Sequence, residues 1–414
     1  MLATRLLFSW TLLLAAPPAA QPVEVDSDWS RLAREVDATW LEGSSPLSAE
    51  LDRLIETDEA RVREIVWRSY REAPIHEELR ADFEANRVRW KEHESPYTLK
   101  EVGERPEGGW PVFIAMHGGG GVAKEVNDSQ WRMMRRYYRA HPEVGGYLYL
   151  ALRAPNDRWN GFYDHYVPPL IERLARQLVL FGDANPDKIF AMGYSHGGYG
   201  AFAIGMKVPD LFAAVHASAA APTGGQGAPR NLHHTIFSAM VGEKDTAYGR
   251  KERCESFAEA IAKLKTGRED VYPVTVEVVE GVGHGGLPDR DRIVGMYPAT
   301  RDPSPKTLSW ELTDDILEDH FWVHVLGPKS GARIEARFQG NRLEVEAKGI
   351  PSMRIGVDSR LTDLEMPVTL VVNGGEPRTI ALRPSVRVLC DWTACRGDLR
   401  LARVAEIAIE LDTQ

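Results

Sequence analysis

Cysteine is scarce in this sequence, which contains three among 414 residues. None of them stands in a C-x-x-C pair, so the spacing typical of structural zinc sites and thiol redox motifs is missing. We therefore expect no metal and no other cofactor. Cys390 and Cys395 lie close together in CDWTAC. In an exported protein this pair could close a small disulfide loop and leave Cys254 unpaired, and we keep that disulfide as a hypothesis.

Positive charge is also in deficit, because 50 lysines and arginines face 60 aspartates and glutamates, a formal net charge of -10. Such a chain has no broad cationic surface with which to neutralise phosphates. We therefore expect neither nucleic acid nor an anionic membrane as its main partner. The 43% of hydrophobic residues is enough for a folded core, and the length of the chain favours more than one domain.

Long apolar runs are missing except at the N-terminus, where the sequence reads MLATRLLFSWTLLLAAPPAA. An early Arg5, an apolar run over residues 6–16 and small residues up to Ala20 are typical of a secretory signal peptide. The run is shorter than the roughly 20 residues of a spanning helix. We predict that residues 1–20 are removed and that the protein is secreted or periplasmic, without a later transmembrane segment. A single N-terminal anchor is the alternative.

Three sections follow, distinguished by the period of their apolar residues. Residues 21–95 are highly charged, with helical spacing in LDRLIETDEARVREIVWRSY, and are predicted to form a helical extension. Residues 96–318 alternate short buried runs such as PVFIAM and YLYLAL with helix-like segments, which predicts an α/β domain around a mostly parallel sheet. Residues 319–414 show two-residue alternation with N-G and G-N turns, which predicts a small antiparallel β domain.

Ser195 lies at the centre of a G-x-S-x-G motif, GYSHGG, between the apolar run KIFAM and a run of small residues. A serine on a sharp turn from strand to helix needs glycine on both sides, because larger side chains would collide there. The position favours a nucleophile, although a glycine-rich turn without chemistry can have the same pattern.

A serine hydroxyl is a weak nucleophile and requires a base, an orienting acid and donors for the oxyanion. HGGGG, residues 117–121, follows the run PVFIAM and can supply backbone N–H groups, as can His196 directly after the serine. A flexible loop or a phosphate cradle is the alternative for HGGGG, but the Lys-Ser/Thr of a P-loop is missing.

The acid and the base are each expected after a further strand. Asp245 follows the run TIFSAMVG, and His284, flanked by glycines, follows PVTVEVVEG. The order serine, aspartate, histidine is that of the α/β-hydrolase triad. The alternatives are Glu243 and Asp289 for the acid, and a predicted core histidine, His216, and the pair His233 and His234 for the base.

The motifs HGGGG, GYSHGG, GEKDTAYG and GVGHGG, in this order, resemble the secreted esterase and depolymerase branch of the α/β-hydrolase superfamily. That branch includes polyhydroxybutyrate depolymerase-like and feruloyl esterase-like enzymes and borders on prolyl oligopeptidase-like catalytic domains. The resemblance covers roughly residues 100–315. It implies an α/β-hydrolase fold, a triad and an oxyanion hole at residues already named: Ser195, Asp245 and His284, with Gly118, Gly119 and His196.

These roles predict a serine hydrolase that cleaves the ester of a small molecule or polymer through an acyl-enzyme. The loop RAPNDRWNGFYDHY is rich in aromatic residues and is predicted to bind the substrate, or alternatively to pack on the sheet, through Trp159, Asn160, Phe162 and Tyr163. A prolyl oligopeptidase-like peptidase stays open, but no propeller precedes the catalytic section. A catalytically inactive binding protein is the other alternative.

Overall fold

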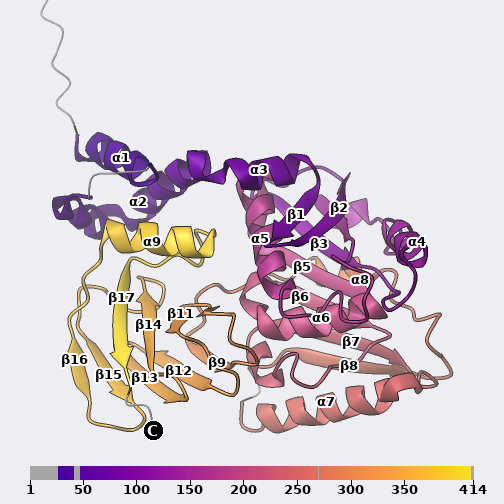
Figure 1. Ribbon diagram of the computed structural model, residues 1–414. Helices are drawn as coiled ribbons and strands as arrows, with labels where there is room; N and C mark the ends of the chain where they lie inside the picture. Colours follow the sequence, from indigo (N-terminus) through magenta and orange to yellow (C-terminus); the bar gives the residue numbers. More distant parts are fainter. Residues whose placement is uncertain (1–26, 42–46, 269, 412–414) are drawn as a thin grey trace, which may run out of the picture.

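The protein is described here by a computed structural model that covers residues 27–41, 47–268 and 270–411. It consists of a large mixed α/β domain, a β domain with two sheets, and helices from both ends of the chain that lie on top of the β domain (Figure 1). The predicted signal peptide lies outside the described residues. None of the helices in the described ranges combines the length and the apolar composition that a membrane span requires.

The α/β domain is built on an eight-stranded sheet with the order β1-β2-β4-β3-β5-β6-β7-β8. The strand β2 runs antiparallel to β1 and β4, and every other pair is parallel. This order is that of the α/β-hydrolase fold, which confirms the predicted fold class. The strands are β1 (Arg87–Trp90), β2 (His93–Val102), β3 (Trp110–Met116), β4 (Tyr147–Leu152), β5 (Ala184–Tyr194), β6 (Ala214–Ser218), β7 (Ile236–Gly242) and β8 (Val274–Val279).

Helices cover both faces of this sheet, as its fully buried strands require. On β3 the side chains of Val112, Ile114 and Met116 pack on one face against α5 (Val167–Phe181), α6 (His196–Lys207) and α7 (Arg250–Lys265). The alternate side chains Phe113 and Ala115 pack on the other face against α4 (Lys124–Met134) and α8 (Arg292–Met296). The continuous apolar runs in the sequence reflect this burial on two sides.

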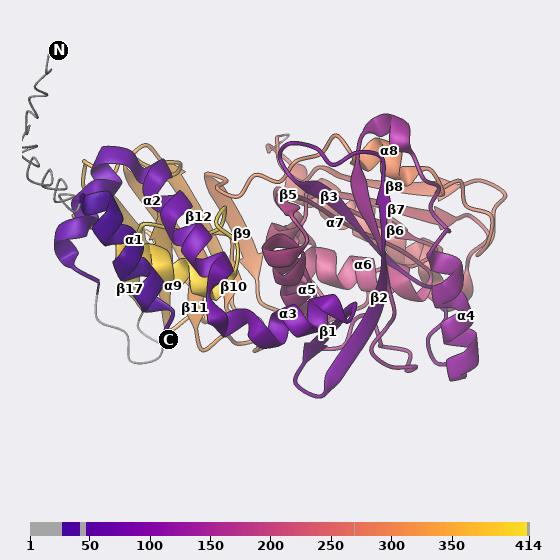
Figure 2. The same cartoon turned by 90° about the horizontal axis from the view of Figure 1, so that it is seen from above.

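The N-terminal section is helical only in part. It forms α1 (Asp28–Thr39), α2 (Arg53–Glu72) and α3 (Glu77–Glu84), but β1 and β2 begin at Arg87 and His93 and join the edge of the large sheet. The prediction of a helical extension up to residue 95 is wrong in these last positions. Figure 2 shows α3 reaching from the helices above the β domain to the sheet of the α/β domain.

The C-terminal section contains two packed sheets with a shared apolar core, and it begins earlier than the predicted residue 319, because β9 (Thr307–Glu311) belongs to it. Most pairs are antiparallel, but β13 and β15 are parallel. The four-stranded sheet has the order β10 (Asp319–His320), β11 (Val323–Leu326), β14 (Ser352–Val357) and β17 (Ala405–Glu410). The five-stranded sheet has the order β16 (Arg378–Ile380), β15 (Val368–Val372), β13 (Arg342–Lys348), β12 (Arg333–Gln339) and β9 (Thr307–Glu311).

One helix in this section contradicts the expectation of β structure alone. The helix α9 (Val386–Arg396) packs on α2, and together the two cover the edge of the β domain (Figure 1). It carries both Cys390, which is buried, and Cys395, which is exposed, and all three cysteines are free thiols. The Cys390–Cys395 disulfide hypothesis is therefore wrong: five positions apart on a helix, the two side chains do not share a face.

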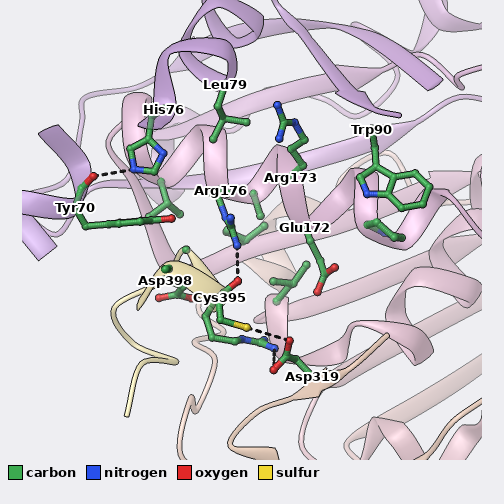
Figure 3. Close-up of a pocket in the computed structure, with 18 of the residues that line it drawn as sticks. Tyr70, His76, Leu79, Trp90, Glu172, Arg173, Arg176, Asp319, Cys395 and Asp398 are labelled. Atoms are coloured by element: carbon green, nitrogen blue, oxygen red, sulfur yellow. Dashed lines mark hydrogen bonds and ion pairs between the residues drawn. The ribbon is translucent and has the colours of Figure 1, made fainter. Parts of the chain in front are cut away.

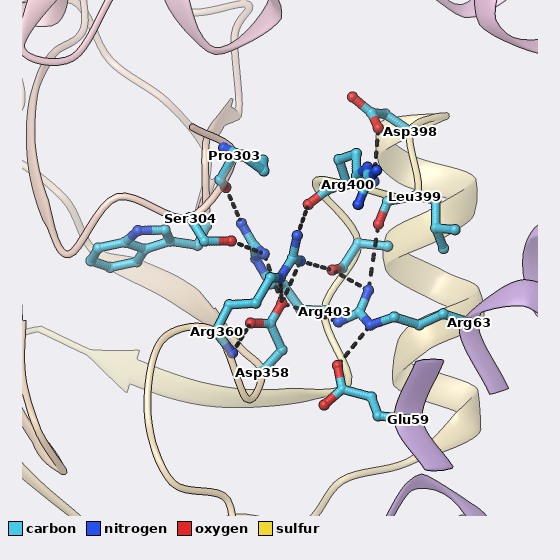
Figure 4. A network of polar contacts seen from close by, with 12 residues as sticks. Glu59, Arg63, Pro303, Ser304, Asp358, Arg360, Asp398, Leu399, Arg400 and Arg403 are labelled. Atoms are coloured by element: carbon cyan, nitrogen blue, oxygen red, sulfur yellow. Dashed lines mark hydrogen bonds and ion pairs between the residues drawn. The ribbon is translucent and has the colours of Figure 1, made fainter. Parts of the chain in front are cut away.

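A buried carboxylate ties the first helices to the C-terminal section (Figure 4). Asp358 accepts hydrogen bonds from Arg403 at 2.8 Å, Arg63 of α2 at 3.0 Å and Arg360 at 2.5 Å. Burial by itself would raise the pKa of Asp358, but the three guanidinium groups hold it well below its usual value. Burial lowers the pKa of Arg403 to about 10.

Candidate active site

The G-x-S-x-G motif forms a sharp turn between β5 and α6. Ser195 has φ 55° and ψ -114°, a region that costs a residue with a side chain about 1–3 kcal/mol. A Cβ atom on Gly193 would collide with the carbonyl oxygen of Gly197, and one on Gly197 with that of Met116. Both glycines are needed because strand, turn and helix backbones touch here. The turn is thus a strained nucleophile elbow in its geometry.

Ser195, His284 and Asp245 form one hydrogen-bonded chain. The Oγ atom of Ser195 lies 2.9 Å from Nε2 of His284, and Nδ1 of His284 lies 2.8 Å from Oδ2 of Asp245. The Asp245 side chain is 2% exposed, whereas that of His284 is 43% exposed. The buried carboxylate can orient the ring, and the exposed side of the ring meets solvent beside the serine.

Sequence reasoning missed the residue that holds the acid. Arg250, at the start of α7, donates from Nη1 to Oδ1 of Asp245 at 2.8 Å and from Nε to the hydroxyl of Tyr199 at 3.0 Å. Its side chain is buried. The only sequence signal was an arginine that begins the helix following the acid, a pattern too common to single out.

The rival acids are engaged elsewhere. Glu243 accepts a hydrogen bond from the backbone N–H of Gly281 at 2.8 Å and so fastens the loop that carries the histidine. Asp289 is buried and accepts from the hydroxyl of Tyr137 at 2.8 Å. Burial raises the pKa of Asp289.

The rival bases are likewise placed apart from the serine. His216 is fully buried between the hydroxyls of Ser238 at 2.7 Å and Ser218 at 2.8 Å, as expected of a core histidine, and burial lowers its pKa to about 3. His234 contacts the carbonyl oxygen of Thr307 at 2.6 Å, and His233 is buried beside it.

The glycine run brings backbone close to the serine. A Cβ atom on Gly118 would lie 3.6 Å from that of Ser195, and one on Gly120 would lie 2.6 Å from the ring of His196. Gly119 and Gly120 both have positive φ values. The side chain of Asn127 on α4, which the sequence did not suggest, accepts from the N–H of Gly120 at 2.8 Å and fixes the loop.

Two histidines support this loop as neutral rings. His117 accepts a hydrogen bond at Nε2 from the N–H of Ala154 at 3.1 Å, and burial lowers its pKa to about 3. His196 is buried between Phe162 and Trp159, and burial lowers its pKa to about 4. The side chain of His196 therefore packs beneath the site, and its N–H is the group placed at the N-terminus of α6.

The four aromatic-loop residues do not share one surface. Phe162 is fully buried, and Tyr163 is 7% exposed. Asn160 donates to the carboxylate of Asp164 at 2.6 Å. Trp159 is 41% exposed, so it presents a free ring face, while the other three pack the loop or hydrogen-bond within it.

Trp159 has a neighbour that the sequence reading missed. The ring of Tyr248 is 68% exposed, and its centroid lies 5.4 Å from that of Trp159. The ring centroid of Tyr199, which is buried, lies 5.8 Å from that of Trp159. The Tyr248 ring lies 5.0 Å from the guanidinium of Arg250, which bonds Asp245, and the Trp159 ring lies 6.3 Å from that of His196, next to Ser195. We call Trp159 and Tyr248 the aromatic pair.

Comparisons with known proteins give distant likenesses in structure. No protein family matches the sequence, and no curated protein sequence matches it. A thermostable esterase aligns at 19% identity and a TM-score of 0.41, over 54% of this chain and 64% of its own. A candidate dipeptidyl aminopeptidase IV from Bacteroides ovatus aligns at 12% identity and a TM-score of 0.36, over 50% of this chain and 33% of its own. A poly(3-hydroxybutyrate) depolymerase from Bordetella parapertussis aligns at 20% identity and a TM-score of 0.34, over 46% of this chain and 79% of its own.

Proposed function

We propose that this protein is a serine hydrolase that cleaves carboxylic esters through an acyl-enzyme on Ser195. The observation that carries the proposal is the chain from Ser195 through His284 to the buried Asp245, with contacts of 2.9 and 2.8 Å, at a strained elbow. A serine that serves only as a turn has no need of a histidine backed by a buried carboxylate.

In the proposed reaction, Ser195 attacks the substrate carbonyl while Nε2 of His284 takes the hydroxyl proton. Asp245 keeps the Nδ1–H of the ring oriented and stabilises the imidazolium. Backbone N–H groups of Gly118, Gly119 and His196 hold the developing oxyanion. His284 then protonates the leaving alcohol, and water repeats the attack to release the acid.

An ester is favoured over an amide because an alcohol leaves more readily than an amine. The aromatic pair indicates the kind of group that the ester substrate carries. Trp159 and Tyr248 present exposed rings, and these rings lie close to His196 and Arg250, the neighbours of Ser195 and Asp245. Exposed aromatic rings bind apolar acyl chains and aromatic or sugar rings by stacking. We propose a substrate with such a group, either a small molecule or a segment of a polymer. Export from the cell also stays a proposal, testable by N-terminal sequencing of the mature protein.

The test is a rate comparison on p-nitrophenyl esters of increasing chain length and on a peptide p-nitroanilide. Ester cleavage by the wild-type protein should fall by about 10³-fold or more in Ser195→Ala. Asp245→Asn should lose activity comparably, because the amide favours the wrong tautomer of His284. The matched variant Glu243→Gln should keep most of the ester-cleavage activity.

Other outcomes would overturn the proposal in distinct ways. Undiminished ester cleavage in a folded Ser195→Ala protein would remove the serine from the reaction. Faster cleavage of the anilide than of every ester would favour the peptidase reading. No cleavage of any substrate by the folded wild-type protein would favour a binding protein instead.

A further inference from the structure

A cavity of about 450 Å³ lies away from the triad, where α3, α5 and the end of α9 meet (Figure 3). Its lining is mostly polar at one end, where Glu172 of α5 and the residues Asp319 and Cys395 face it. Figure 3 shows the Glu172 carboxylate and the Cys395 sulfur pointing into this region. The triad residues do not line it, so the proposed ester hydrolysis leaves this feature unexplained.

Three side chains of the metal-binding type converge beside the polar end, where Asp319 and Cys395 line the cavity and His324 contacts Asp319. Asp319 and His324 face each other as register partners in the β10–β11 pair, and Cys395 comes from the last turn of α9. Nδ1 of His324 lies 3.0 Å from Oδ1 of Asp319, and Sγ of Cys395 lies 3.5 Å from Oδ2 of Asp319. One ligand atom from each of the three residues lies within 4.8 Å of the other two.

We propose that Asp319, His324 and Cys395 bind a divalent metal ion of the zinc type. Around a tetrahedral zinc ion with bonds of about 2.0–2.3 Å, neighbouring ligand atoms are roughly 3.3–3.6 Å apart. In the structure, His324 lies 3.0 Å from Oδ1 of Asp319 and Cys395 lies 3.5 Å from Oδ2, and one ligand atom from each residue lies within 4.8 Å of the others. Small side-chain rotations would therefore bring one Asp319 oxygen, the sulfur and the imidazole nitrogen to tetrahedral separations. A thiolate, an imidazole and a carboxylate together select zinc or cobalt over calcium or magnesium, which prefer oxygen ligands.

Binding requires two proton adjustments that the site can make. Cys395 releases its thiol proton to solvent as the bond from sulfur to metal forms. His324 binds through the nitrogen that faces Asp319, so its remaining proton moves to Nε2. The fourth position is left to water from the cavity that Asp319 and Cys395 line.

The positive charge of Arg396 lies next to the proposed site, so the ligands must carry enough negative charge to hold a divalent cation there. Nη1 of Arg396 lies 3.5 Å from Oδ1 of Asp319, and its Nη2 is paired with the buried Asp210 of the α/β domain. With Cys395 as a thiolate and Asp319 ionised, the ligands carry two negative charges, which balance a divalent ion. Arg396 can keep its ion pair with Asp210 when a metal ion binds, so the arginine side chain can stay in place.

The proposed ion would fasten the end of α9 to the β10–β11 pair. The same end of α9 contacts the α/β domain, because Arg176 of α5 donates to the carbonyl oxygen of Cys395 at 2.5 Å. A metal ion here would therefore brace the junction between the two domains. Binding energy of this kind adds to the stability of the folded protein.

The sequence holds only a partial sign of this site. His320 and His324 have the H-x-x-x-H spacing of zinc-binding helices. The structure places them on a β pair instead, where the His320 ring is buried and stacks on Trp310. The third ligand comes from a distant helix, so the expectation of no metal site followed from patterns along the chain alone.

The test uses Co²⁺, whose bond to a thiolate gives a charge-transfer absorption band in the near ultraviolet. The full chain, reduced and freed of metal with a chelator, is titrated with Co²⁺ and then with Zn²⁺. We expect one equivalent of Co²⁺ to bind with a thiolate band, and Zn²⁺ to displace it. In Cys395→Ser the band should vanish. His324→Gln should weaken the affinity for Co²⁺ by at least roughly 10–100-fold, the loss usual when a residue that only supports a metal ligand is replaced.

Cys390→Ser is the matched control, because Cys390 lies on the same helix but is fully buried on its other side. This variant should keep the band. The proposal is overturned if the folded wild-type protein shows no thiolate band at millimolar Co²⁺, or if the band persists in Cys395→Ser. Neither readout depends on ester hydrolysis, so the two proposals can fail separately.

Discussion

Arg250 donates to Oδ1 of Asp245 at 2.8 Å, the carboxylate oxygen that His284 leaves free. The acid is therefore held from both sides, and its side chain is only 2% exposed. An unpaired buried carboxylate would be costly, and a guanidinium offers donors in a fixed geometry that a lysine lacks. Arg250 is thus a positioning residue for the proposed triad.

Replacing Arg250 by methionine should lower kcat by roughly 10–100-fold and leave KM for a short-chain ester nearly unchanged. The reason is that the acid loses its fixed orientation. Arg250 also lies 5.0 Å from the Tyr248 ring centroid, and a short-chain ester is used because it depends least on the aromatic pair. Arg250→Lys should restore part of kcat. The measurement is a steady-state comparison of kcat and KM after both variants are shown to be folded.

The control for this change is Arg253→Met on the same helix, whose guanidinium donates to the carbonyl oxygen of Pro222 at 2.5 Å. It should leave kcat within about a factor of two to three. An equal loss in both variants would mean that α7 is destabilised as a whole, which would contradict the positioning role.

Removing one member of the aromatic pair should change the substrate preference. Trp159→Ala should lower kcat/KM for long-chain or aromatic esters by about tenfold, since aromatic contacts contribute about 0.5–1.5 kcal/mol beyond area burial. The rate for p-nitrophenyl acetate should change little because an acetyl group offers almost no apolar surface to the rings. A uniform loss across the ester series would show instead that Trp159 supports the loop, as buried Phe162 does.

The ion cluster around Asp358 should make stability depend on pH in the acid range. Its pKa is lowered in the folded protein, so the stabilisation is complete above the unfolded value near 3.9 and is lost as the pH falls toward the folded value. Asp358→Asn should lower the free energy of unfolding at pH 7 by about 3–5 kcal/mol, because it leaves Arg403 buried without a charged partner.

The difference in the free energy of unfolding between Asp358→Asn and the wild type should narrow as the pH falls from about 4 toward 2, as measured by urea unfolding at each pH. Glu376→Gln removes an exposed carboxylate and serves as the control, with little effect at either pH. A difference that stays constant with pH would mean that Asp358 contributes through packing and not through its charge.

Much of the α/β domain could be predicted because its signals are local. Fully apolar runs such as PVFIAM and YLYLAL became β3 and β4, and the helical spacing between runs became covering helices. The boundary of the N-terminal section was missed because β1 is a short edge strand rich in charge, and β2 beside it carries polar and charged residues among its apolar ones. The helix α9 was missed because its residues follow no clear period of 3.6.

Some residues of the candidate site could be predicted from local sequence signals, and others could not. Ser195, Asp245 and His284 could be singled out because each follows a predicted strand, and in a parallel sheet the carboxyl ends of the strands share one edge. Asn127 and Tyr248 could not, because nothing along the chain says that their side chains turn toward this edge. Their places depend on how α4 and the loop before α7 pack.

The sequence by itself determined the class of the large sheet, the glycines of the elbow and the order of the three proposed catalytic residues. Periodicity and steric demands act between neighbours in the chain, so they can be read there. Only the tertiary structure decided that Cys390 and Cys395 are not bonded, that Arg250 holds Asp245, and that Cys395 meets Asp319 and His324. The first two relationships join residues five positions apart, and they depend on the helix α9 and on the turn into α7, which the residue pattern does not indicate. The third joins distant segments, which only the packing of the whole chain brings within a few ångströms of each other.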